Sequence, residues 1–584
     1  MKNIKHVLLF LKEHKFRYIV GIFILIAIDG LQLVTPWLIG NLTDDVMNSA
    51  LDPAGIWRYI FFILLTAGGV AIGRFSWRVL IIGSSKKLEA WLRAKLFGHL
   101  ELLSANFFNT HKTGDLMALA TNDLNSVRMA FGMGIILIVD AVFLTLMTLT
   151  TMITSIDLGL TLMAFLPMPI IAVSVMFLGF RMRNRFQKVQ EAFGTLTDKV
   201  QETFSGIRIV KSFVQEESEL AKFEEANDDN LKKNMSLIRI WGLMFPLVGL
   251  VASVSLLVTL SVGGNMVIDG TLSLGQFVTF ITYIGLLTWP MMAIGWVVNV
   301  MQRGFVSLGR IAEVLDTEPE IVDADDVDKT PPSQWSITFD DVTFTYPGAE
   351  VPALDKLNFT LQEGQTLAIV GRTGSGKTTL LNLLLRMYDT TSGEIRIGDR
   401  PLQSITLKDL RNNIGVVPQD NYLFSQPIAD NIRFGVDEAS MDTVKNYAEV
   451  ASIRKEIEDF AGGFETLLGE RGVNMSGGQK QRVSIARALI KDPSILVLDD
   501  SLSAVDTKTE EKILDHLKEQ MVGRTAIIVA HRISTVRDAD HILVLDEGKI
   551  IQSGTHGMLV DQDGLYKELH DKQQLEEFIM EEAR

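Results

Sequence analysis

The chain has 584 residues, 47% of them hydrophobic, and a formal net charge of −15. An acidic excess is the opposite of what a protein that coats nucleic acid needs, so we expect no nucleic-acid partner. Cysteine is absent, which excludes disulfides, cysteine-ligated metal sites and a cysteine nucleophile. The charge is uneven: 27 Lys and Arg stand against 22 Asp and Glu up to residue 310, then 28 against 48. This difference predicts two parts of different character.

The first part contains stretches long and apolar enough to cross a membrane, which takes roughly 20 residues. Three of them contain no charged residue at all. We therefore expect an all-α transmembrane domain of six helices over residues 1–317, embedded in membrane lipid. The expected spans are Tyr18–Gly40, Tyr59–Gly83, Met129–Ile156, Leu158–Phe180, Ile240–Ile268 and Thr271–Gln302.

Charges in the loops predict the orientation, because Lys and Arg concentrate on the cytoplasmic side. The first 17 residues and the long loops around 84–128 and 181–239 are rich in basic residues, whereas the short alternate loops are acidic. This pattern predicts a multi-pass protein of the plasma membrane, with both ends in the cytoplasm. The two long loops are expected to continue the helices as rods, with tips at Asn109–Leu116 and Ser205–Val214.

Two carboxylates, Asp29 and Asp140, fall inside expected spans, where charge is costly and often functional. Two interpretations stay open. The carboxylates face a central substrate cavity and attract amphipathic cations, or they are structural and pair with Arg74 or neighbouring helices.

A polar, acidic linker over residues 318–335, which contains Pro331 and Pro332, predicts a boundary before a second domain at 336–584. In that domain a short apolar strand, Thr366–Val370, precedes a GxxxxGK[ST] motif. Such a loop binds phosphates through backbone N–H groups at a helix N-terminus. Lys377 is expected to reach the β- and γ-phosphates, and Thr378 to ligate Mg²⁺. The ATP-binding residues predicted here are Gly371, Arg372, Thr373, Gly374, Ser375, Gly376, Lys377, Thr378 and Thr379.

Two further motifs follow the phosphate loop. The apolar strand Ile495–Leu498 ends in Asp499 and Asp500, and Asp499 has the position expected to hold Mg²⁺ through water. Between the two lies Ser476-Gly477-Gly478-Gln479, a serine and glycine pair at an expected helix start, which makes a second phosphate cradle.

With these motifs, nearly the whole chain resembles the ATP-binding cassette exporters. The resemblance implies an α/β P-loop nucleotide-binding domain after the membrane domain, ATP and Mg²⁺ as cofactors, and two chains that pack head to tail. It also implies roles for individual residues. Tyr346 stacks on adenine, Gln419 touches Mg²⁺, His531 contacts the γ-phosphate, Asp506 lies in a loop exchanged across the dimer, and Ser476, Gly477, Gly478 and Gln479 act on the partner's ATP.

One residue departs from the family pattern. The family has a catalytic glutamate after the Mg²⁺-binding aspartate, and here that position is Asp500. Its side chain is one methylene shorter, and a misplacement of about 1 Å can lower a rate about 10²-fold. We therefore expect the chain to resemble the degenerate-site subunit of bacterial heterodimeric multidrug exporters, whose different partner chain carries the glutamate. A homodimer in which Asp500 still works is the alternative.

The resemblance favours ATP-driven export of a hydrophobic or amphipathic small-molecule substrate. Two other functions stay open from the sequence. A flippase for lipids or lipid-linked sugars has the same architecture, and a regulatory ATP-binding subunit of a membrane sensor or channel would retain the same nucleotide motifs.

Overall fold

The computed structural model describes residues 2–49, 52–324, 327, 330–500, 513, 516–517, 519 and 521–582. The chain divides into two compact units. The first comprises Met1–Glu101 and Lys112–Thr317, and the second comprises Leu102–His111 and Glu318–Arg584.

Six helices of the first unit are long and apolar enough to span a membrane, which confirms the number that the sequence predicted. The longest contains 53 residues, whereas roughly 20 are enough to cross a bilayer. The helices therefore extend well past the expected spans, as the predicted rods require. Their bounds are Lys5–Met47, Pro53–Leu100, Thr113–Ser155, Leu158–Ser205, Glu216–Ile268 and Leu274–Leu315.

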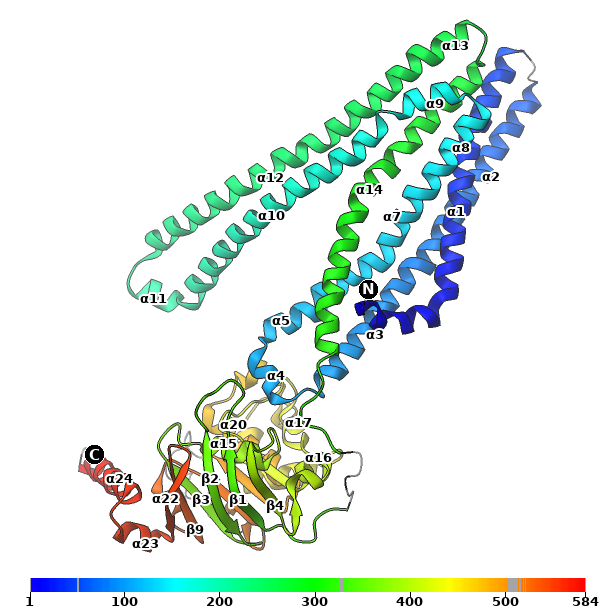
Figure 1. Ribbon diagram of the computed structural model, residues 1–584. Coiled ribbons are helices and arrows are strands. Elements are labelled where there is room, and N and C mark those ends of the chain that lie inside the picture. The colour runs from blue at the N-terminus through cyan, green and yellow to red at the C-terminus, as the bar shows by residue number, and fades with distance from the viewer. Residues whose placement is uncertain are drawn as a thin grey trace. The chain divides into compact units, whose positions relative to one another are not determined.

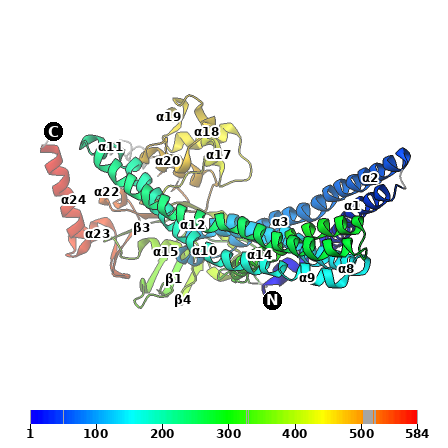
Figure 2. The ribbon, with the colours of Figure 1, turned by 90° about the horizontal axis from the view of Figure 1, so that it is seen from above.

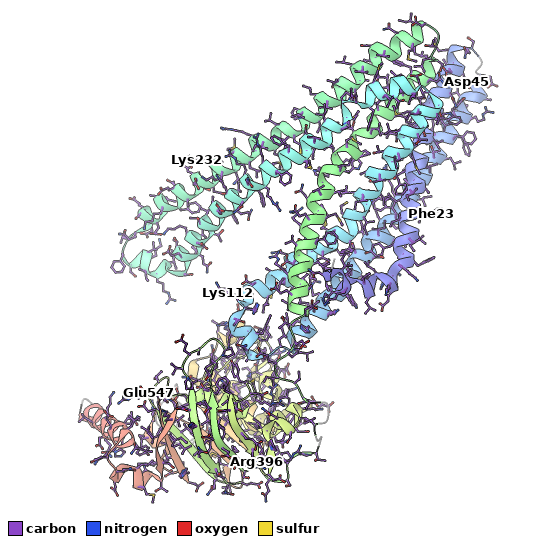
Figure 3. The ribbon with its side chains drawn as sticks, viewed as in Figure 1. Phe23, Asp45, Lys112, Lys232, Arg396 and Glu547 are labelled. Atoms are coloured by element: carbon purple, nitrogen blue, oxygen red, sulfur yellow. The ribbon has the colours of Figure 1, made fainter. Side chains whose placement is uncertain are left out.

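Figure 1 shows these helices with most of their α-helical segments labelled, and short π-helical turns join several of the segments. Their exposed surface is rich in apolar side chains: Phe23 of α1, labelled in Figure 3, is 71% exposed. The segments are α1 (Lys5–Met47), α2 (Pro53–Trp77), α3 (Gly83–Leu100), α5 (Thr113–Ala118), α6 (Leu124–Met129), α7 (Ile135–Val139), α8 (Thr145–Ser155), α9 (Leu158–Phe165), α10 (Met168–Ser205), α11 (Ile207–Ser212), α12 (Glu216–Val258), α13 (Gly264–Ile268) and α14 (Leu274–Leu315).

The antiparallel helices α1 and α14 are joined closely where α1 ends and α14 begins. One carboxylate oxygen of Asp44 accepts a hydrogen bond from Ser273 Oγ at 2.6 Å, and the other accepts one from the Gly275 N–H at 2.7 Å. The latter contact satisfies a backbone donor that has no partner inside its own helix. A Cβ on Gly275 would lie 2.1 Å from the carbonyl oxygen of Gly40, so the two backbones touch.

The same two helices are also joined where α1 is interrupted by Pro36. Proline cannot donate a backbone hydrogen bond, so the helix loses part of its internal ladder there. Thr279 Oγ1 donates to the Pro36 carbonyl at 3.2 Å, and the Tyr283 hydroxyl donates to the Leu33 carbonyl at 2.9 Å. Side chains of α14 thus bind the backbone of α1 near its proline.

At the other end of the pair, Asp316, which follows α14, binds the start of α1. Its Oδ1 contacts Lys5 Nζ at 2.8 Å and His6 Nε2 at 2.9 Å. Burial lowers the pKa of the His6 imidazole, and the charge of Asp316 opposes that shift. The α1–α14 pair is therefore fixed at both of its ends.

Helices α10 and α12 form a long antiparallel hairpin with α11 at its tip (Figures 1 and 2). An ion pair joins the two arms near the tip, with 3.0 Å between Lys199 Nζ and Glu219 Oε2. Ile209 and Phe213, at the tip, are exposed. The hairpin turn lies within the predicted stretch Ser205–Val214.

The short helix α4 (Ala105–Thr110) belongs to the second unit. Asn109 Nδ2 donates to the Tyr388 hydroxyl at 2.7 Å, and Ser104 and Asn106 both donate to the Glu320 carboxylate. The predicted tip, Asn109–Leu116, overlaps the end of α4 and includes Asn109, whereas Ser104 and Asn106 precede it.

Two sheets make up the core of the second unit, and α-helices complete it. An antiparallel sheet has the order β2-β1-β4-β5, and a six-stranded sheet has the order β10-β9-β3-β8-β7-β6. In the latter, β3, β6, β7, β8 and β9 pair in parallel. The strands are β1 (Ile337–Phe344), β2 (Leu354–Leu361), β3 (Thr366–Gly371), β4 (Ser392–Ile397), β5 (Arg400–Pro401), β6 (Ile414–Val417), β7 (Ile495–Asp499), β8 (Thr525–Val529), β9 (His541–Asp546) and β10 (Lys549–Gly554).

A parallel strand that is buried on both faces usually has a continuous apolar sequence. All five residues of β7 and all five of β8 are buried. This explains why these strands were recognisable in the sequence. Besides α4, the α-helices among the described residues of the unit are α15 (Lys377–Leu384), α16 (Leu407–Asn413), α17 (Ile428–Arg433), α18 (Met441–Val450), α19 (Arg454–Glu458), α20 (Gly477–Leu489), α22 (Ile533–Val536), α23 (His556–Asp561) and α24 (Leu565–Glu582).

The close approach of α1 and α14 can be tested with one methyl group. Gly275→Ala places a methyl against the Gly40 carbonyl, and overpacking of this kind costs about 1–3 kcal/mol. The matched control is Gly285→Ala on the same helix, where a Cβ meets no atom within 4 Å. In thermal unfolding followed by tryptophan fluorescence, Gly275→Ala should lower Tm and Gly285→Ala should not. Equal melting temperatures for the two variants would contradict the close packing.

Candidate functional site

A cavity of about 280 Å³ lies where the strands of the six-stranded sheet end. Four neighbouring strands, β3, β8, β7 and β6, lead into the loops that surround it. Most of the residues that the sequence predicted for ATP and Mg²⁺ come together here. The lining consists of Tyr346, Ala353, Thr373, Gly374, Gly376, Lys377, Thr378, Thr379, Gln419, Asp499, Asp500, Val529 and His531.

The loop after β3 has a backbone that only glycine adopts easily. Gly374 and Gly376 have φ angles of +84° and +100°, a region that other residues enter only with strain. A Cβ on Gly376 would also lie 2.7 Å from the Ala353 carbonyl oxygen. Gly376 directly precedes α15, whose first N–H groups have no partner within the helix. The loop is therefore shaped to turn backbone donors toward an anion.

Lys377 begins α15, and its side chain lies back over the loop. Its Nζ donates to the carbonyl oxygens of Gly371 at 2.9 Å and Arg372 at 2.8 Å, and it lies 3.5 Å from Ser375 Oγ. Burial lowers the pKa of the Lys377 ammonium, whereas the carboxylates of Asp499 and Asp500 act in the opposite direction. A positive charge is thus held at the centre of the loop. Gly371, Arg372 and Ser375 contribute to the site by holding this lysine.

Two oxygen ligands suited to Mg²⁺ lie next to each other in the cavity. Thr378 Oγ1 donates to Asp499 Oδ2 at 3.1 Å. Burial raises the pKa of the Asp499 carboxyl, and the hydrogen bond from Thr378 lowers it. Gln419 supplies a third oxygen on the cavity lining. Because Mg²⁺ prefers hard oxygen ligands and completes its shell with water and phosphate oxygens, this set of residues fits it.

The aromatic ring of Tyr346 is fixed at the cavity by its neighbours. Its hydroxyl lies 3.1 Å from Thr379 Oγ1. The rings of Phe344 and Tyr388 pack edge-on against it, with centroids 4.8 and 5.4 Å away. The exposed part of the ring therefore offers a flat surface of fixed orientation beside the phosphate loop, as stacking on a base requires.

The loop that carries Gln419 is held by two residues that the sequence analysis did not identify. Asn431, fully buried, receives a hydrogen bond from the Phe424 N–H at 2.9 Å and donates to the Phe424 carbonyl at 3.0 Å. Arg487 of α20 donates to Asn431 and to the Tyr422 carbonyl. Burial lowers the pKa of Arg487 to about 10. Asparagine in an amphipathic stretch gives no sequence signal of such a role.

Ser476 caps the start of α20, where the sequence predicted a second phosphate cradle. Ser476 Oγ accepts from the Gln479 N–H at 3.3 Å, and the Ser476 N–H donates to Gln479 Oε1 at 2.9 Å, which makes a reciprocal capping box. Glu456 of α19, missed in the sequence, accepts from Gln479 Nε2 at 2.9 Å and from both terminal nitrogens of Arg482. The described residues that line the 280 Å³ cavity do not include Ser476, Gly477, Gly478 or Gln479.

Asp500 and His531 face the same cavity from neighbouring strand ends. Asp500 has a φ angle of +47°, and its N–H donates to the Val529 carbonyl at 2.8 Å. Gln481 Nε2 donates to the Asp500 carbonyl at 3.1 Å. The backbone of Asp500 is therefore held from both sides. Asp506, the residue predicted for the exchanged loop, lies outside the described residues.

The membrane carboxylates lie in the first unit. The Asp29 side chain is buried, with 1% of the residue exposed. Its Oδ1 accepts a hydrogen bond from Gln32 Nε2 at 3.3 Å, and its Oδ2 has no hydrogen-bond partner among the described residues. Gln32 Oε1 in turn accepts from Arg74 at 2.8 Å. Arg74 thus reaches Asp29 through an amide, and Asp140 is close enough to interact electrostatically with Asp29.

Comparisons with known proteins agree with this geometry. Residues 18–291 match the family model described as ABC transporter transmembrane region, and residues 354–503 match the one described as ABC transporter. The chain is 40% identical, over 98% of each chain, to the probable multidrug resistance ABC transporter ATP-binding/permease protein YheI of Bacillus subtilis. It is 32% identical to the ATP-dependent lipid A-core flippase of Syntrophus aciditrophicus, over 100% of this chain and 96% of that one.

A solved structure, that of a bacterial Atm1-family ABC exporter with ATP bound, superimposes with a TM-score of 0.80 at 28% identity, covering 95% of this chain and 99% of that one. The cavity, the six apolar helices and these matches lead to one conclusion. The chain belongs to the ABC transporter family and has the organisation of an exporter half-transporter, with a membrane domain followed by an ATPase domain.

Proposed function

We propose that the chain is one half of a heterodimeric exporter that uses ATP to move hydrophobic or amphipathic compounds out of the cell, with one slow and one fast ATP site. In this proposal both ends of the chain lie in the cytoplasm. The observation that carries the unequal sites is Asp500, a shortened carboxylate on the lining of an otherwise complete ATP cavity.

The position of Asp500 leaves little freedom to compensate for its length. Its N–H and its carbonyl are both hydrogen-bonded to residues of other elements, Val529 and Gln481. A backbone shift that carries the carboxylate about 1 Å further into the cavity must break one of these contacts. A general base misplaced by that distance loses about 10²-fold in rate. ATP bound by this chain's own phosphate loop is therefore hydrolysed slowly.

The cradle at the start of α20 is intact by comparison. Ser476 and Gln479 cap each other, and Glu456 holds Gln479 from the neighbouring helix. A chain with a weak base and an ordered cradle at Ser476–Gln479 is suited to a division of roles, in which its cradle completes the partner's ATP site. The partner is then a different half-transporter that supplies a glutamate.

The remaining residues of the cavity have roles that follow from their chemistry. Tyr346 stacks on the adenine, the loop N–H groups and Lys377 bind the phosphates, and His531 contacts the γ-phosphate. Thr378, Asp499 and Gln419 would hold Mg²⁺, which would neutralise charge that builds up on the phosphates. Phosphate binding by this loop draws Lys377 away from the Gly371 and Arg372 carbonyls.

Support for the substrate class comes from the relatives and from Asp29. The relative with 40% identity bears a multidrug-resistance name, and the one with 32% identity is called a lipid flippase. Asp29 keeps one carboxylate oxygen without a hydrogen-bond partner among the described residues. A buried carboxylate at membrane depth is costly and often functional, and its negative charge attracts a cation. We therefore favour amphipathic cations, which reach Asp29 and Asp140 when the helices part.

The division of roles predicts opposite results for two substitutions in the assembled complex. Asp500→Asn should change its ATP turnover by less than about twofold, because the slow site contributes little. Ser476→Ala should remove most of the turnover, because it disrupts the cradle at the fast site. Ser440→Ala is the matched control. The Ser440 side chain caps α18 by accepting a hydrogen bond from the Thr443 N–H at 3.1 Å, so this variant also loses a helix cap, worth about 1 kcal/mol.

Turnover would be measured by phosphate release from the complex in lipid nanodiscs. Loss of activity in Asp500→Asn, or equal activity of Ser476→Ala and Ser440→Ala, would contradict unequal sites.

The cation site is tested by transport in reconstituted vesicles. Asp29→Asn removes the charge and keeps the shape, so uptake of a cationic dye into inside-out vesicles should fall about tenfold. Uptake of a neutral amphipathic probe should stay the same, since no charge is recognised. Asp269→Asn, a charge removed outside the spans, is the control. If Asp29→Asn lowers the uptake of both probes equally, Asp29 has a structural role. If the vesicles transport a fluorescent phospholipid and neither of the two probes, the result favours a flippase.

A further inference from the structure

The last helix of the chain makes a specific contact with the loop that carries His531. Gln573, on α24, lies 42 residues from His531 in sequence, yet its Nε2 donates to the His531 carbonyl at 2.6 Å. Its Oε1 accepts from the Ile533 N–H at 2.8 Å. One side-chain amide therefore holds two backbone groups that lie two residues apart.

This arrangement fixes the orientation of the amide and of the loop together. Only the oxygen can accept from the Ile533 N–H, and only the nitrogen can donate to the His531 carbonyl. The two hydrogen bonds restrain the peptide groups on either side of Arg532. The direction in which the His531 side chain leaves the backbone is restrained with them.

The loop leads into a helix that is too short to hold it firmly. It connects β8 to α22, which has only four residues, Ile533–Val536. A helix of one turn gains few hydrogen bonds for the backbone that it fixes. The first N–H of a helix needs a partner from outside the helix, and here Gln573 supplies it. The opposite side of the loop is anchored by the buried strand β8.

Gln573 is in turn held in place by the packing of α24. Leu565 and Tyr566 are buried, and Leu569 packs against the same core. Gln573 follows Leu569 by four residues, so it lies on the same face of the helix. The Tyr566 hydroxyl is 2.7 Å from His556 Nδ1, which ties α24 to α23. The amide is presented to the loop by a docked helix rather than by a free tail.

His531 itself faces the ATP cavity, together with Lys377, Asp499 and Asp500. It is close enough to Asp499 to interact with it electrostatically. A shift of the His531 backbone would therefore move its ring relative to the part of the cavity where the terminal phosphate is expected. In the proposed binding mode, the α- and β-phosphates contact the loop around Lys377 and not this ring.

We propose that Gln573 is a positioning residue that sets His531 for the γ-phosphate, so that the C-terminal helix contributes to the discrimination of ATP from ADP. The inference rests on the proposed role of His531. Gln573 touches no nucleotide; it acts through the backbone of the loop. Its loss weakens interactions with the γ-phosphate and leaves those with ADP as they are.

The test is photolabelling of the full-length chain in nanodiscs by radioactive 8-azido-ATP, with ATP or ADP as competitor. The labelled chain is identified by its size on a gel, so the measurement can be made on the chain alone or in complex with a partner. Labelling does not require ATP hydrolysis. Gln573→Ala should weaken competition by ATP about threefold to tenfold, as expected for two lost hydrogen bonds. Competition by ADP should not change.

Two variants separate positioning from folding. Gln573→Glu has the same shape and can accept from Ile533, but it cannot donate to the His531 carbonyl, so it should lose ATP competition as well. Gln574→Ala, at the exposed neighbouring position, should behave as the unmodified chain. His531→Ala should show the same selective loss, and combining it with Gln573→Ala should add little, because the two residues act in one chain of contacts.

The outcomes are distinct. If His531→Ala weakens ATP competition and Gln573→Ala does not, the proposal is wrong and the role of His531 stands. If Gln573→Ala weakens ATP and ADP equally, Gln573 is structural and the proposal is also wrong. If His531→Ala leaves the ATP to ADP ratio unchanged, the proposed role of His531 fails, and the inference fails with it.

Discussion

Neighbouring parallel strands end at one edge of the six-stranded sheet, and the nucleotide cavity depends on that edge. β3, β8, β7 and β6 lie side by side, and each leads into a loop that supplies part of the site. The register of the parallel pairing aligns the carboxyl ends of β7 and β8. Asp499, the last residue of β7, pairs with Val529, the last residue of β8, and His531 follows Val529 by two residues. Parallel pairing therefore gathers residues that lie far apart in sequence. Without that pairing, the phosphate loop would have neither Asp499 nor His531 beside it.

Around this edge, the chain uses single side chains to hold loops that carry chemistry. Asn431 and Arg487 hold the segment after Gln419, Glu456 holds the start of α20, and Gln573 holds the loop after β8. Each of these side chains forms hydrogen bonds with backbone groups or with a residue of a predicted motif. None of them is among the described residues that line the cavity. Loops are the mobile parts of a domain, so these contacts decide how well the catalytic groups are placed.

The sequence was sufficient to predict the six spans and the groups that line the cavity. Six apolar runs longer than a bilayer crossing are typical of membrane helices and rare in other folds, and Lys377, Thr378 and Asp499 belong to motifs with fixed spacing. Glu456, Asn431 and Gln573 could not be predicted. Each is a polar residue in a helix, where a solvated side chain is the usual expectation, and only the tertiary packing shows its partner. The predicted tip Asn109–Leu116 included Asn109, which contacts Tyr388, but not Ser104 and Asn106, which contact Glu320.

The unequal ATP sites that we propose rest on one missing methylene at Asp500, whose N–H and carbonyl are both hydrogen-bonded. The most direct measurement is ATP turnover by this chain purified alone, compared with that of the assembled complex. The account predicts that turnover by the chain alone lies about 10²-fold below that of the complex, because the base that this chain supplies is one methylene short. Turnover by the chain alone that equals that of the complex would contradict it.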